Sequence, residues 1–483
     1  MSISYGQGSE CRTAKLVLAL RGVVGAENCI VDDEHKARYL VDWRKLYSGK
    51  TLAVIRPGTT EEAAAVVRAC AAANVGVVPQ GGNTGLVGGA IPISDGEEII
   101  ISLERMNRIR ALDKANYTVT VEAGCVLSRL HNVVAEASLF FPLSLGAEGS
   151  CQIGGNLATN AGGNAVLRYG SIRNLALGLE VVLPNGQIWN GLRALRKDNA
   201  GYDLRNLFIG SEGTLGLITA AVLQLFPPPT HITTCVLGFP SLERLPDIYG
   251  FLRERLSYGL SAFELMPGHA VDLASETLRG IRRPMRASHP YYALVEVSDF
   301  SQDAVGNSAV EATTMELLER QLISDAVIAA SAAQRRDFWK AREGIVDMQP
   351  LLGAVAKHDI SVPVSNIGSF ISQAAEVIDK IAPGVLQIAF GHVGDGNIHL
   401  NLIERENEKM SAFRARAQEI GVALYDLVDA FEGSFSAEHG IGQLRRQDLI
   451  SRRSSIEIDV MRAVKRTIDP QGLFNRGKLF ATP

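Results

Sequence analysis

Short apolar runs alternate with helical periodicity in the first half of the chain. Leu52-Ala-Val-Ile-Arg-Pro57 predicts a buried strand that ends at proline, and Gly76-Val-Val-Pro79 predicts a second strand. Between them, Thr60 followed by two glutamates is typical of the start of a helix. The inner stripe of this helix is expected at Val66, Val67 and Cys70. Two further apolar runs around Pro184-Asn-Gly predict a hairpin over residues 178–188.

The rest of the chain mixes apolar strands with amphipathic helices. Residues 291–298 predict a strand and residues 308–322 predict a helix, which is an α+β pattern. Pro227-Pro-Pro229 marks the clearest boundary. Residues 12–44 have roughly helical spacing and predict an N-terminal helical cap. We predict four parts: the N-terminal cap at residues 1–44, a first domain at 45–228, a second domain at 229–430 and a C-terminal segment at 431–483.

Composition narrows the class of protein. The 483 residues, 46% of them hydrophobic, suffice for more than one core. A net charge of −4 gives no basic field for nucleic acid. Six scattered cysteines without a Cys-x-x-Cys pair fit a reduced protein. No uncharged run reaches the roughly 18 residues of a membrane-spanning helix. We therefore expect a cytoplasmic protein with no nucleic-acid partner and no transmembrane segment.

Glycines gather in three stretches that are expected to lie on loops. The first, Gln80-Gly-Gly-Asn-Thr-Gly-Leu-Val-Gly-Gly89, follows the second predicted strand. Its glycines would let backbone amides approach a pyrophosphate, although the spacing is not the dinucleotide fingerprint Gly-x-Gly-x-x-Gly. By itself, this loop is almost equally consistent with a glycine-rich turn that binds no ligand. Residues 146–163 and 209–219 add many more backbone donors, so the three stretches together predict a cleft for a dinucleotide.

Two histidine-containing segments predict a second kind of chemistry. In Gly391-His-Val-Gly-Asp-Gly-Asn-Ile-His-Leu-Asn401, a turn separates His392 from a strand that carries His399. Nearly forty residues later, Glu438 and His439 are neighbours between small residues. The set His392, His399 and Glu438 could hold zinc, manganese or iron with positions open for a substrate, and His439 would remain as a base. The alternative is that these histidines cap turns and satisfy hydrogen bonds in the core.

Together these motifs resemble those of the FAD-linked 2-hydroxyacid dehydrogenases, which include D-2-hydroxyglutarate and D-lactate dehydrogenases and the flavin subunit of glycolate oxidase. The motifs occur in order from Leu52 to Lys478: Pro79-Gln-Gly-Gly-Asn-Thr-Gly85, Gly154-Gly-Asn, Asn160-Ala-Gly-Gly163, Gly210-Ser-Glu-Gly-Thr-Leu-Gly216, Gly391–His399 and Ala437-Glu-His-Gly440. The resemblance implies an α+β fold. It comprises a two-lobed FAD-binding domain of the vanillyl-alcohol oxidase and p-cresol methylhydroxylase type, and a substrate domain with an antiparallel sheet. The C-terminal segment returns to the flavin.

The resemblance also assigns the cofactor-binding residues. It places the pyrophosphate on Gly81, Gly82, Asn83, Thr84 and Gly85, the flavin cleft on Gly154, Gly155, Asn160 and Gly163, the adenosine and ribityl portion on Glu212, Gly213 and Ile218, and the flavin end on Asn475. Relatives with covalent FAD carry a histidine in the first glycine loop. Because Asn83 and Thr84 stand there, the resemblance implies FAD bound without a covalent bond.

For the substrate, the resemblance implies zinc on His392, His399 and Glu438, with His439 as the catalytic base. It implies Arg342, Lys357 and Asn401 as substrate-binding residues. From charge alone, Arg342 fits a solvated helix face and Lys357 fits a pair with Asp359. One position departs from the hydroxyglutarate pattern, because Val346 stands where those relatives have threonine. The length of the acid is therefore open at this point.

The expected reaction is oxidation of a small D-2-hydroxyacid to the 2-oxoacid. Its electrons would pass to an electron-transfer flavoprotein, a cytochrome or a quinone, and the expected assembly is a homodimer. Two alternatives stand beside it: an oxidase that uses oxygen, and a flavin subunit of a glycolate oxidase-like complex.

Overall fold

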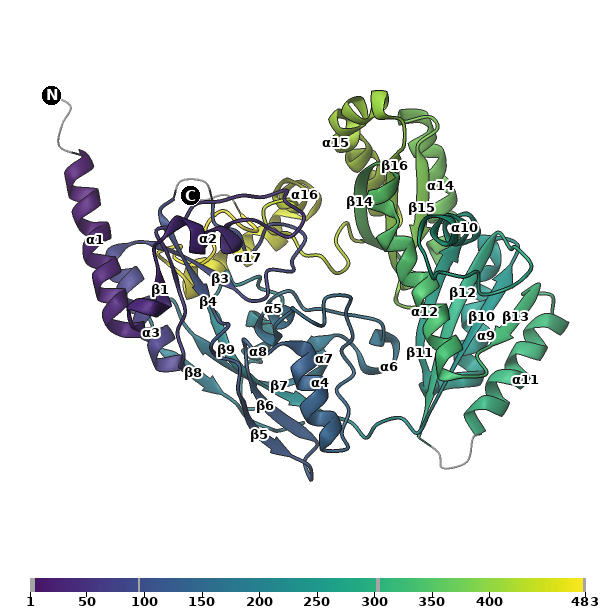
Figure 1. Ribbon diagram of the computed structural model, residues 1–483, viewed down its shortest axis with the longest axis horizontal. Coiled ribbons are helices and arrows are strands. Elements are labelled where there is room, and N and C mark those ends of the chain that lie inside the picture. Colours follow the sequence, from purple (N-terminus) through teal and green to yellow (C-terminus); the bar gives the residue numbers. More distant parts are fainter. Residues whose placement is uncertain (1–4, 94–95, 301–304, 481–483) are drawn as a thin grey trace. The chain divides into compact units, whose positions relative to one another are not determined.

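The computed structural model describes residues 5–93, 96–300 and 305–480, and it divides into two compact units (Figure 1). The first unit comprises residues 1–163, 170–228 and 438–483, and the second comprises residues 164–169 and 229–437. The N-terminal, glycine-rich and C-terminal segments therefore belong to the same unit. Among the described residues, no helix has both the length and the apolar character needed to cross a membrane.

The first sheet of the first unit has the strand order β1-β2-β4-β3, with β1 antiparallel and the others parallel. Helix α3 connects β2 to β3, and the Thr59 hydroxyl caps it by accepting from the amide of Glu62 at 3.1 Å. The predicted inner stripe is confirmed, because its three residues are fully buried. The bounds are β1 Cys29–Ile30, β2 Ala53–Ile55, α3 Thr60–Ala73, β3 Gly76–Gln80 and β4 Glu98–Ser102.

The N-terminal segment is not entirely helical, contrary to expectation. Helix α1 (Tyr5–Val24), a 3₁₀ turn η1 (Ala26–Asn28) and helix α2 (Asp33–Leu40) surround β1. Strand β1 exists because Cys29 and Ile30 pair with two residues of β2. Helical spacing could not predict this strand, since the pairing partner lies more than twenty residues away.

The second sheet of the first unit is antiparallel, with the order β5-β6-β9-β7-β8. The predicted hairpin is confirmed as β7 and β8, and the Gly186 amide closes its turn on the Leu183 carbonyl at 2.8 Å. The bounds are β5 Ile109–Asp113, β6 Thr118–Glu122, β7 Ala176–Val182, β8 Ile188–Gly191, β9 Leu217–Gln224, α4 Leu127–Glu136, α5 Ile153–Ala158, α7 Ile172–Leu175 and α8 Arg205–Phe208.

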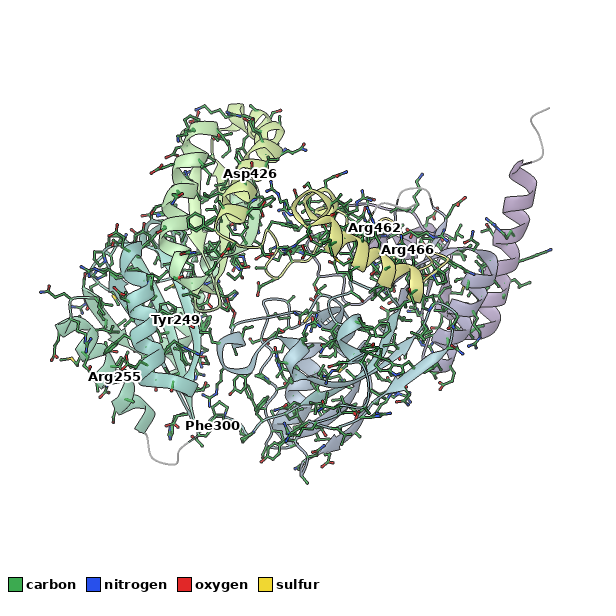
Figure 2. The ribbon with its side chains drawn as sticks, turned by 180° about the vertical axis from the view of Figure 1, so that it is seen from behind. Tyr249, Arg255, Phe300, Asp426, Arg462 and Arg466 are labelled. Atoms are coloured by element: carbon green, nitrogen blue, oxygen red, sulfur yellow. The ribbon has the colours of Figure 1, made fainter. Side chains whose placement is uncertain are left out.

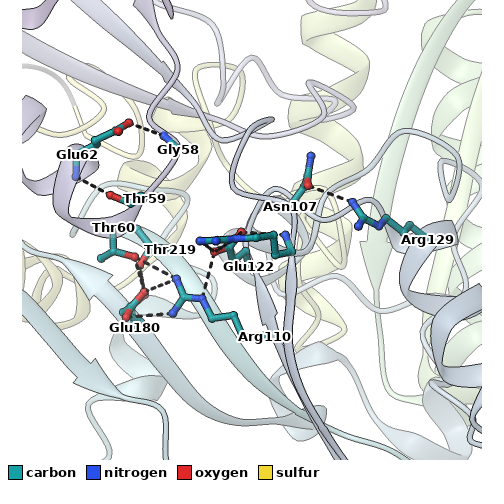
Figure 3. A network of polar contacts seen from close by, with 11 residues as sticks. Gly58, Thr59, Thr60, Glu62, Asn107, Arg110, Glu122, Arg129, Glu180 and Thr219 are labelled. Carbon is teal, nitrogen blue, oxygen red and sulfur yellow. Dashed lines mark hydrogen bonds and ion pairs between the residues drawn. The ribbon is translucent and has the colours of Figure 1, made fainter. Parts of the chain in front are cut away.

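A buried polar network ties this sheet to α3 (Figure 3). Arg110 bonds both Glu122 of β6, at 3.2 Å, and Glu180 of β7, at 3.1 Å. The second carboxylate also accepts from the hydroxyls of Thr60 at 2.6 Å and Thr219 at 2.8 Å. The network therefore joins the strands β5, β6, β7 and β9 to helix α3.

The C-terminal segment packs beside the first sheet. It contains α16 (Arg446–Arg452) and α17 (Ser455–Ile468), which carries Arg462 and Arg466 (Figure 2). After α17, Phe474 forms a parallel bridge with Val77 of β3. This bridge brings the segment that follows α17 to the strand that precedes the first glycine loop.

The second unit contains two antiparallel sheets, β11-β12-β10-β13 and β14-β16-β15. Leu265 of β11 pairs with Gly391, which directly follows β15, so the edges of the two sheets are joined. The bounds are β10 His231–Phe239, β11 Leu260–Pro267, β12 Tyr291–Asp299, β13 Asp325–Ile328, β14 Ala354–Ser361, β15 Leu386–Phe390 and β16 Asn397–Glu404.

The helices of the second unit cover these sheets. The main core combines buried residues of α10 and α12 with residues of both sheets, among them Met266, Tyr292 and Phe390. Between α9 and α11, Arg255 pairs with Glu316 at 2.7 Å (Figure 2). The bounds are α6 Val166–Tyr169, η2 Leu242–Arg244, α9 Leu245–Leu256, η3 Ser257–Gly259, α10 Gly268–Thr277, α11 Val305–Glu319, α12 Ala332–Asp347, α13 Gln349–Leu352, η4 Val364–Asn366, α14 Ile367–Ile381, η5 Val393–Asp395 and α15 Asn407–Ala430.

Candidate cofactor-binding and active site

A cavity of about 290 Å³ runs along the glycine-rich segments of the first unit. Most of the residues expected to bind the cofactor line it: Gly81, Gly82, Asn83, Thr84, Gly85, Gly154, Gly155, Glu212, Gly213, Ile218 and Asn475. Glu438 and His439 line the same cavity. The three glycine-rich stretches therefore contribute to one cavity, as a dinucleotide requires.

Glycine is required at some of these positions and leaves space at others. A Cβ on Gly82 would lie 2.0 Å from the carbonyl oxygen of Ser150, and a Cβ on Gly154 would lie 2.7 Å from the Cβ of Ala123. At Gly85 and Gly155 a Cβ would have no atom within 4 Å. The backbone is thus packed closely on one side and open on the other, which suits a pyrophosphate bound by amides. The residues present fit FAD.

Asn160 and Gly163 are placed differently, since neither lines this cavity. The Asn160 side-chain oxygen accepts from the Ser171 hydroxyl at 2.9 Å and the Arg173 amide at 3.3 Å. Gly163 has φ +91°, and a Cβ there would lie 2.3 Å from the Ser144 carbonyl oxygen. Both residues shape the loop, and their contact with the flavin remains a prediction.

Glu212 and Asn475 hold the C-terminal segment against the cavity. The Glu212 carboxylate accepts from the amides of Ile441 at 2.8 Å and Gly442 at 2.7 Å. Burial raises the pKa of Glu212, and these two amides oppose the rise. The Asn475 side chain donates to the Glu212 carbonyl at 2.6 Å. The segment that begins with Glu438 is therefore fixed within the first unit.

In the second unit, strand β11 places a buried carboxylate beside the first histidine. Glu264 Oε1 accepts from His392 Nδ1 at 2.6 Å, and Oε2 accepts from Arg342 Nε at 2.9 Å. Burial alone would raise the pKa of Glu264, but the charges of His392 and Arg342 outweigh it and lower the pKa to about 2. An ionised carboxylate can only accept, so Nδ1 of His392 carries a proton, and Nε2 is the ring nitrogen that a metal ion would bind.

His399 has a similar arrangement on the neighbouring strand. It lies opposite Asp359 in the β14–β16 pairing, and its Nδ1 is 3.5 Å from the Asp359 carboxylate. The centroids of the His392 and His399 rings are 5.6 Å apart. The turn between them forms as predicted, with Gly396 at φ +88°. Two imidazoles thus lie side by side, each with Nδ1 facing a carboxylate.

The expected substrate residues lie near this pair. Asn401 shares the face of β16 with His399, as predicted, and Lys357 lies opposite Asn401 on β14. Asn401 is buried, and its side-chain nitrogen donates to Gln349 at 2.9 Å. Val346, one turn after Arg342 on α12, is 36% exposed. The contact of Arg342, Lys357 and Asn401 with a substrate remains a prediction.

These side chains could hold a metal ion. The ligand atoms of His392 and His399 lie within 4.8 Å of one another, as do those of His399 and Asp359. The Ala437 amide donates to the Asp359 carbonyl at 3.3 Å. Glu438 and His439 directly follow Ala437 in the sequence, and their part in a metal site remains a prediction. The chemistry of the donors, imidazole and carboxylate, suits a divalent transition metal.

The sequence interpretation did not predict a role for Glu264 or Gln349. It also did not predict that Asp359 is a partner of His399. Glu264 had a signal, because it is the only charged residue in the apolar run Leu260–Pro267. A lone carboxylate in a buried strand requires partners. Gln349 had no comparable signal, since its role depends on the packing of α13 against β16.

Known proteins identify the family. The family of FAD-linked oxidase C-terminal domains matches residues 228–479, and the FAD-binding domain family matches residues 51–191. A D-2-hydroxyglutarate dehydrogenase of Xanthomonas citri pv. viticola is 37% identical over 96% of this chain and 97% of its own. The chain belongs to the FAD-linked oxidase family. A mitochondrial D-2-hydroxyglutarate dehydrogenase of Arabidopsis thaliana is 35% identical over 96% of this chain and 81% of its own.

Solved structures agree with this FAD-linked oxidase assignment at the level of the fold. The chain superimposes on p-cresol methylhydroxylase with a TM-score of 0.76 and 16% identity, covering 100% of this chain and 98% of that one. The chain superimposes on a 4-ethylphenol oxidase from Gulosibacter chungangensis with a TM-score of 0.74 and 18% identity, again covering 100% of this chain and 98% of that one. The expected α+β flavoprotein fold is confirmed, and the chain is an FAD-binding oxidoreductase.

Proposed function

We propose that this FAD-linked oxidase family member oxidises a D-2-hydroxyacid, of the D-2-hydroxyglutarate or D-lactate type, to the 2-oxoacid. Relatives of both names support the class: besides the hydroxyglutarate dehydrogenases, a protein of Schizosaccharomyces pombe named as a mitochondrial D-lactate dehydrogenase is 36% identical over 95% of this chain and 88% of its own. The observation that carries the proposal is the pair His392 and His399, each with Nδ1 turned to a carboxylate.

The chain's own residues divide the work. His392, His399 and Glu438 hold the divalent ion, with zinc the expected identity, and Arg342, Lys357 and Asn401 bind the substrate carboxylates. His439 takes the hydroxyl proton as the base. Bound metal would stabilise the developing alkoxide, and bound FAD would accept the α-hydrogen as hydride at N5. The substrate thus loses one proton and one hydride, and it leaves as the 2-oxoacid.

The glycine loop carries Asn83 and Thr84 and no histidine, so FAD is bound without a covalent bond in this proposal. The chain is cytoplasmic and forms a homodimer, and its acceptor is an electron-transfer flavoprotein, a cytochrome or a quinone. Acid precipitation should release all the FAD into the supernatant. Flavin that stays in the denatured pellet would contradict the non-covalent assignment.

Anaerobic reduction of the flavin by a panel of D- and L-hydroxyacids tests the function. We expect bleaching by D-acids without any partner protein, and slow reoxidation in air. Fast reoxidation would favour the oxidase, and bleaching only after other subunits are added would favour a glycolate oxidase-like complex.

A chelator should abolish bleaching while the FAD spectrum persists, and Zn²⁺ or Mn²⁺ should restore bleaching. Full activity in metal-free protein contradicts the metal assignment.

A further inference from the structure

Glu264 is a carboxylate in a strand where no water can solvate it. Its side chain is 1% exposed, and all eight residues of β11 are buried. An ionised group in such a place is stable only when charged hydrogen-bonding partners replace water. Replacing a whole buried ion pair with apolar residues is often neutral for stability, so a structural role alone does not account for this pairing.

The two oxygens of Glu264 bind different partners. Oε1 faces His392, the proposed metal ligand, and Oε2 faces Arg342, the proposed substrate ligand. We propose that Glu264 is a positioning residue that couples metal binding at His392 to substrate binding at Arg342. The inference rests on the proposed function and adds a residue that acts through both ligands.

Toward His392, Glu264 fixes the tautomer in which Nε2 presents its lone pair to a metal. Carboxylates that accept from the far nitrogen of a ligating histidine typically increase metal affinity by about 10–100-fold. Toward Arg342, it occupies the Nε edge of the guanidinium, while the Phe390 ring lies 4.8 Å from the guanidinium carbon. Held on one edge and one face, Arg342 can offer its two terminal nitrogens to a carboxylate.

An amide at this position can satisfy only one of these partners. In Glu264→Gln, an oxygen turned to Arg342 leaves the NH₂ group facing His392, which would then protonate on Nε2 and lose its metal-binding lone pair. The opposite rotamer places the NH₂ group against the Arg342 N–H, which leaves two donors facing each other. Either way, one partner faces the wrong group, and the neutral amide holds the other partner more weakly than the carboxylate does.

The neighbouring strand offers a matched control. Glu296 of β12 accepts from Trp339 of α12 at 2.9 Å and from the Thr234 hydroxyl at 2.9 Å. It also links a strand to α12, one turn before Arg342, but its side-chain partners among the described residues are a tryptophan and a threonine and not a histidine. Glu296→Gln therefore removes a comparable carboxylate from the same sheet and helix.

The test measures zinc affinity by competition with a chromophoric chelator on FAD-loaded protein, and KM in the flavin assay with added zinc. Glu264→Gln should bind zinc about 10–100-fold more weakly. Excess zinc should restore metal content but leave KM raised by about 10-fold or more, the loss expected for a displaced charged hydrogen bond. Glu296→Gln should match the wild type in both measurements.

The coupling can also be tested by changing Arg342 and measuring zinc affinity. This second variant keeps the test decisive if Glu264→Gln does not fold. Arg342→Met removes the competing donor, so Glu264 should polarise His392 more strongly and zinc should bind about 5-fold more tightly, the lower end of typical couplings. Arg342→Lys keeps the charge and should leave zinc affinity unchanged. Unaltered zinc affinity in both Glu264→Gln and Arg342→Met overturns the inference. Wild-type protein that binds no zinc and is bleached by no hydroxyacid overturns the proposed function instead.

Discussion

Each unit contains a buried pairing of carboxylate and arginine. The two pairings differ in whether their polar groups bond only to one another or can also bind a ligand. In the first unit, both oxygens of Glu180 accept from Arg110, and Thr60 and Thr219 add hydroxyl donors (Figure 3). Glu122 accepts from Arg110 and from the backbone and side chain of Arg108. All its polar groups bond to one another, so the network locks four strands to a helix.

The pairing in the second unit extends to groups with further binding capacity. Glu264 uses one oxygen each for His392 and Arg342. Nε2 of His392 is the ring nitrogen that a metal ion would bind, and the terminal nitrogens of Arg342 make no hydrogen bond to another described residue. The comparison indicates that a closed network stabilises a fold, whereas an open one prepares a site for ligands.

The largest effect should come from the proposed base, His439, and its neighbour Glu438. His439→Asn should lower the rate of flavin reduction by about 10²–10⁴, the usual range for a lost general base, and keep FAD and metal. Glu438→Gln should lose metal instead, because an amide is a poorer ligand than a carboxylate. Stopped-flow reduction and elemental analysis measure both. Wild-type reduction by His439→Asn, or metal loss from it alone, would show that the two roles are exchanged.

The closed network should affect stability and not catalysis. Arg110→Met leaves Glu122 and Glu180 with fewer donors, so unfolding should require about 2–4 kcal/mol less, somewhat below the usual cost of a broken buried pair because Arg110 is 26% exposed. Denaturant titration gives this number. Arg193→Met removes an exposed pair with Asp198 and should cost less than about 1 kcal/mol. A changed KM in folded Arg110→Met would contradict the closed character of the network.

Acid should weaken the closed network in a defined direction. Burial opposes the shift, but the Arg110 interactions prevail and lower the pKa of Glu180 below its ordinary value of 4.5. A lowered folded-state pKa contributes stability above about pH 4.5, and this contribution is lost as the pH falls through the folded-state value. Stability curves between pH 7 and pH 3 should therefore slope less steeply for Glu180→Gln than for the wild type. Equal slopes would show that Glu180 does not change its protonation on unfolding.

The smallest expected effect concerns substrate choice near the open pairing. Val346→Thr places a hydroxyl one turn from Arg342, where it could donate to a distal carboxylate. The ratio of kcat/KM for D-2-hydroxyglutarate over D-lactate should rise about 10-fold, the value of one hydrogen bond to a charged group. Val346→Ala is the control without a hydroxyl. A ratio that rises equally in both variants would indicate added space and not a new hydrogen bond.

Local features of this protein were predictable from the sequence. The strand, helix and strand between Leu52 and Gln80 and the turn at Gly396 form as predicted. Side-chain alternation correctly placed His399 and Asn401 on one face. These features depend on sterics and hydrogen bonds within a few residues, and the resemblance added the cofactor and the reaction class.

Contacts between distant segments were decided only by the tertiary structure. Glu264 meets His392 across 128 residues because Leu265 pairs with Gly391, and one residue of slip would turn Glu264 to the other face of the sheet. The strand at Cys29, the turn of Asn160 toward Ser171 and the bond from Asn401 to Gln349 are of the same kind. The sequence determines which side chains can bind a metal or a carboxylate. Register and packing determine which of them meet, because those depend on the whole core and not on neighbours along the chain.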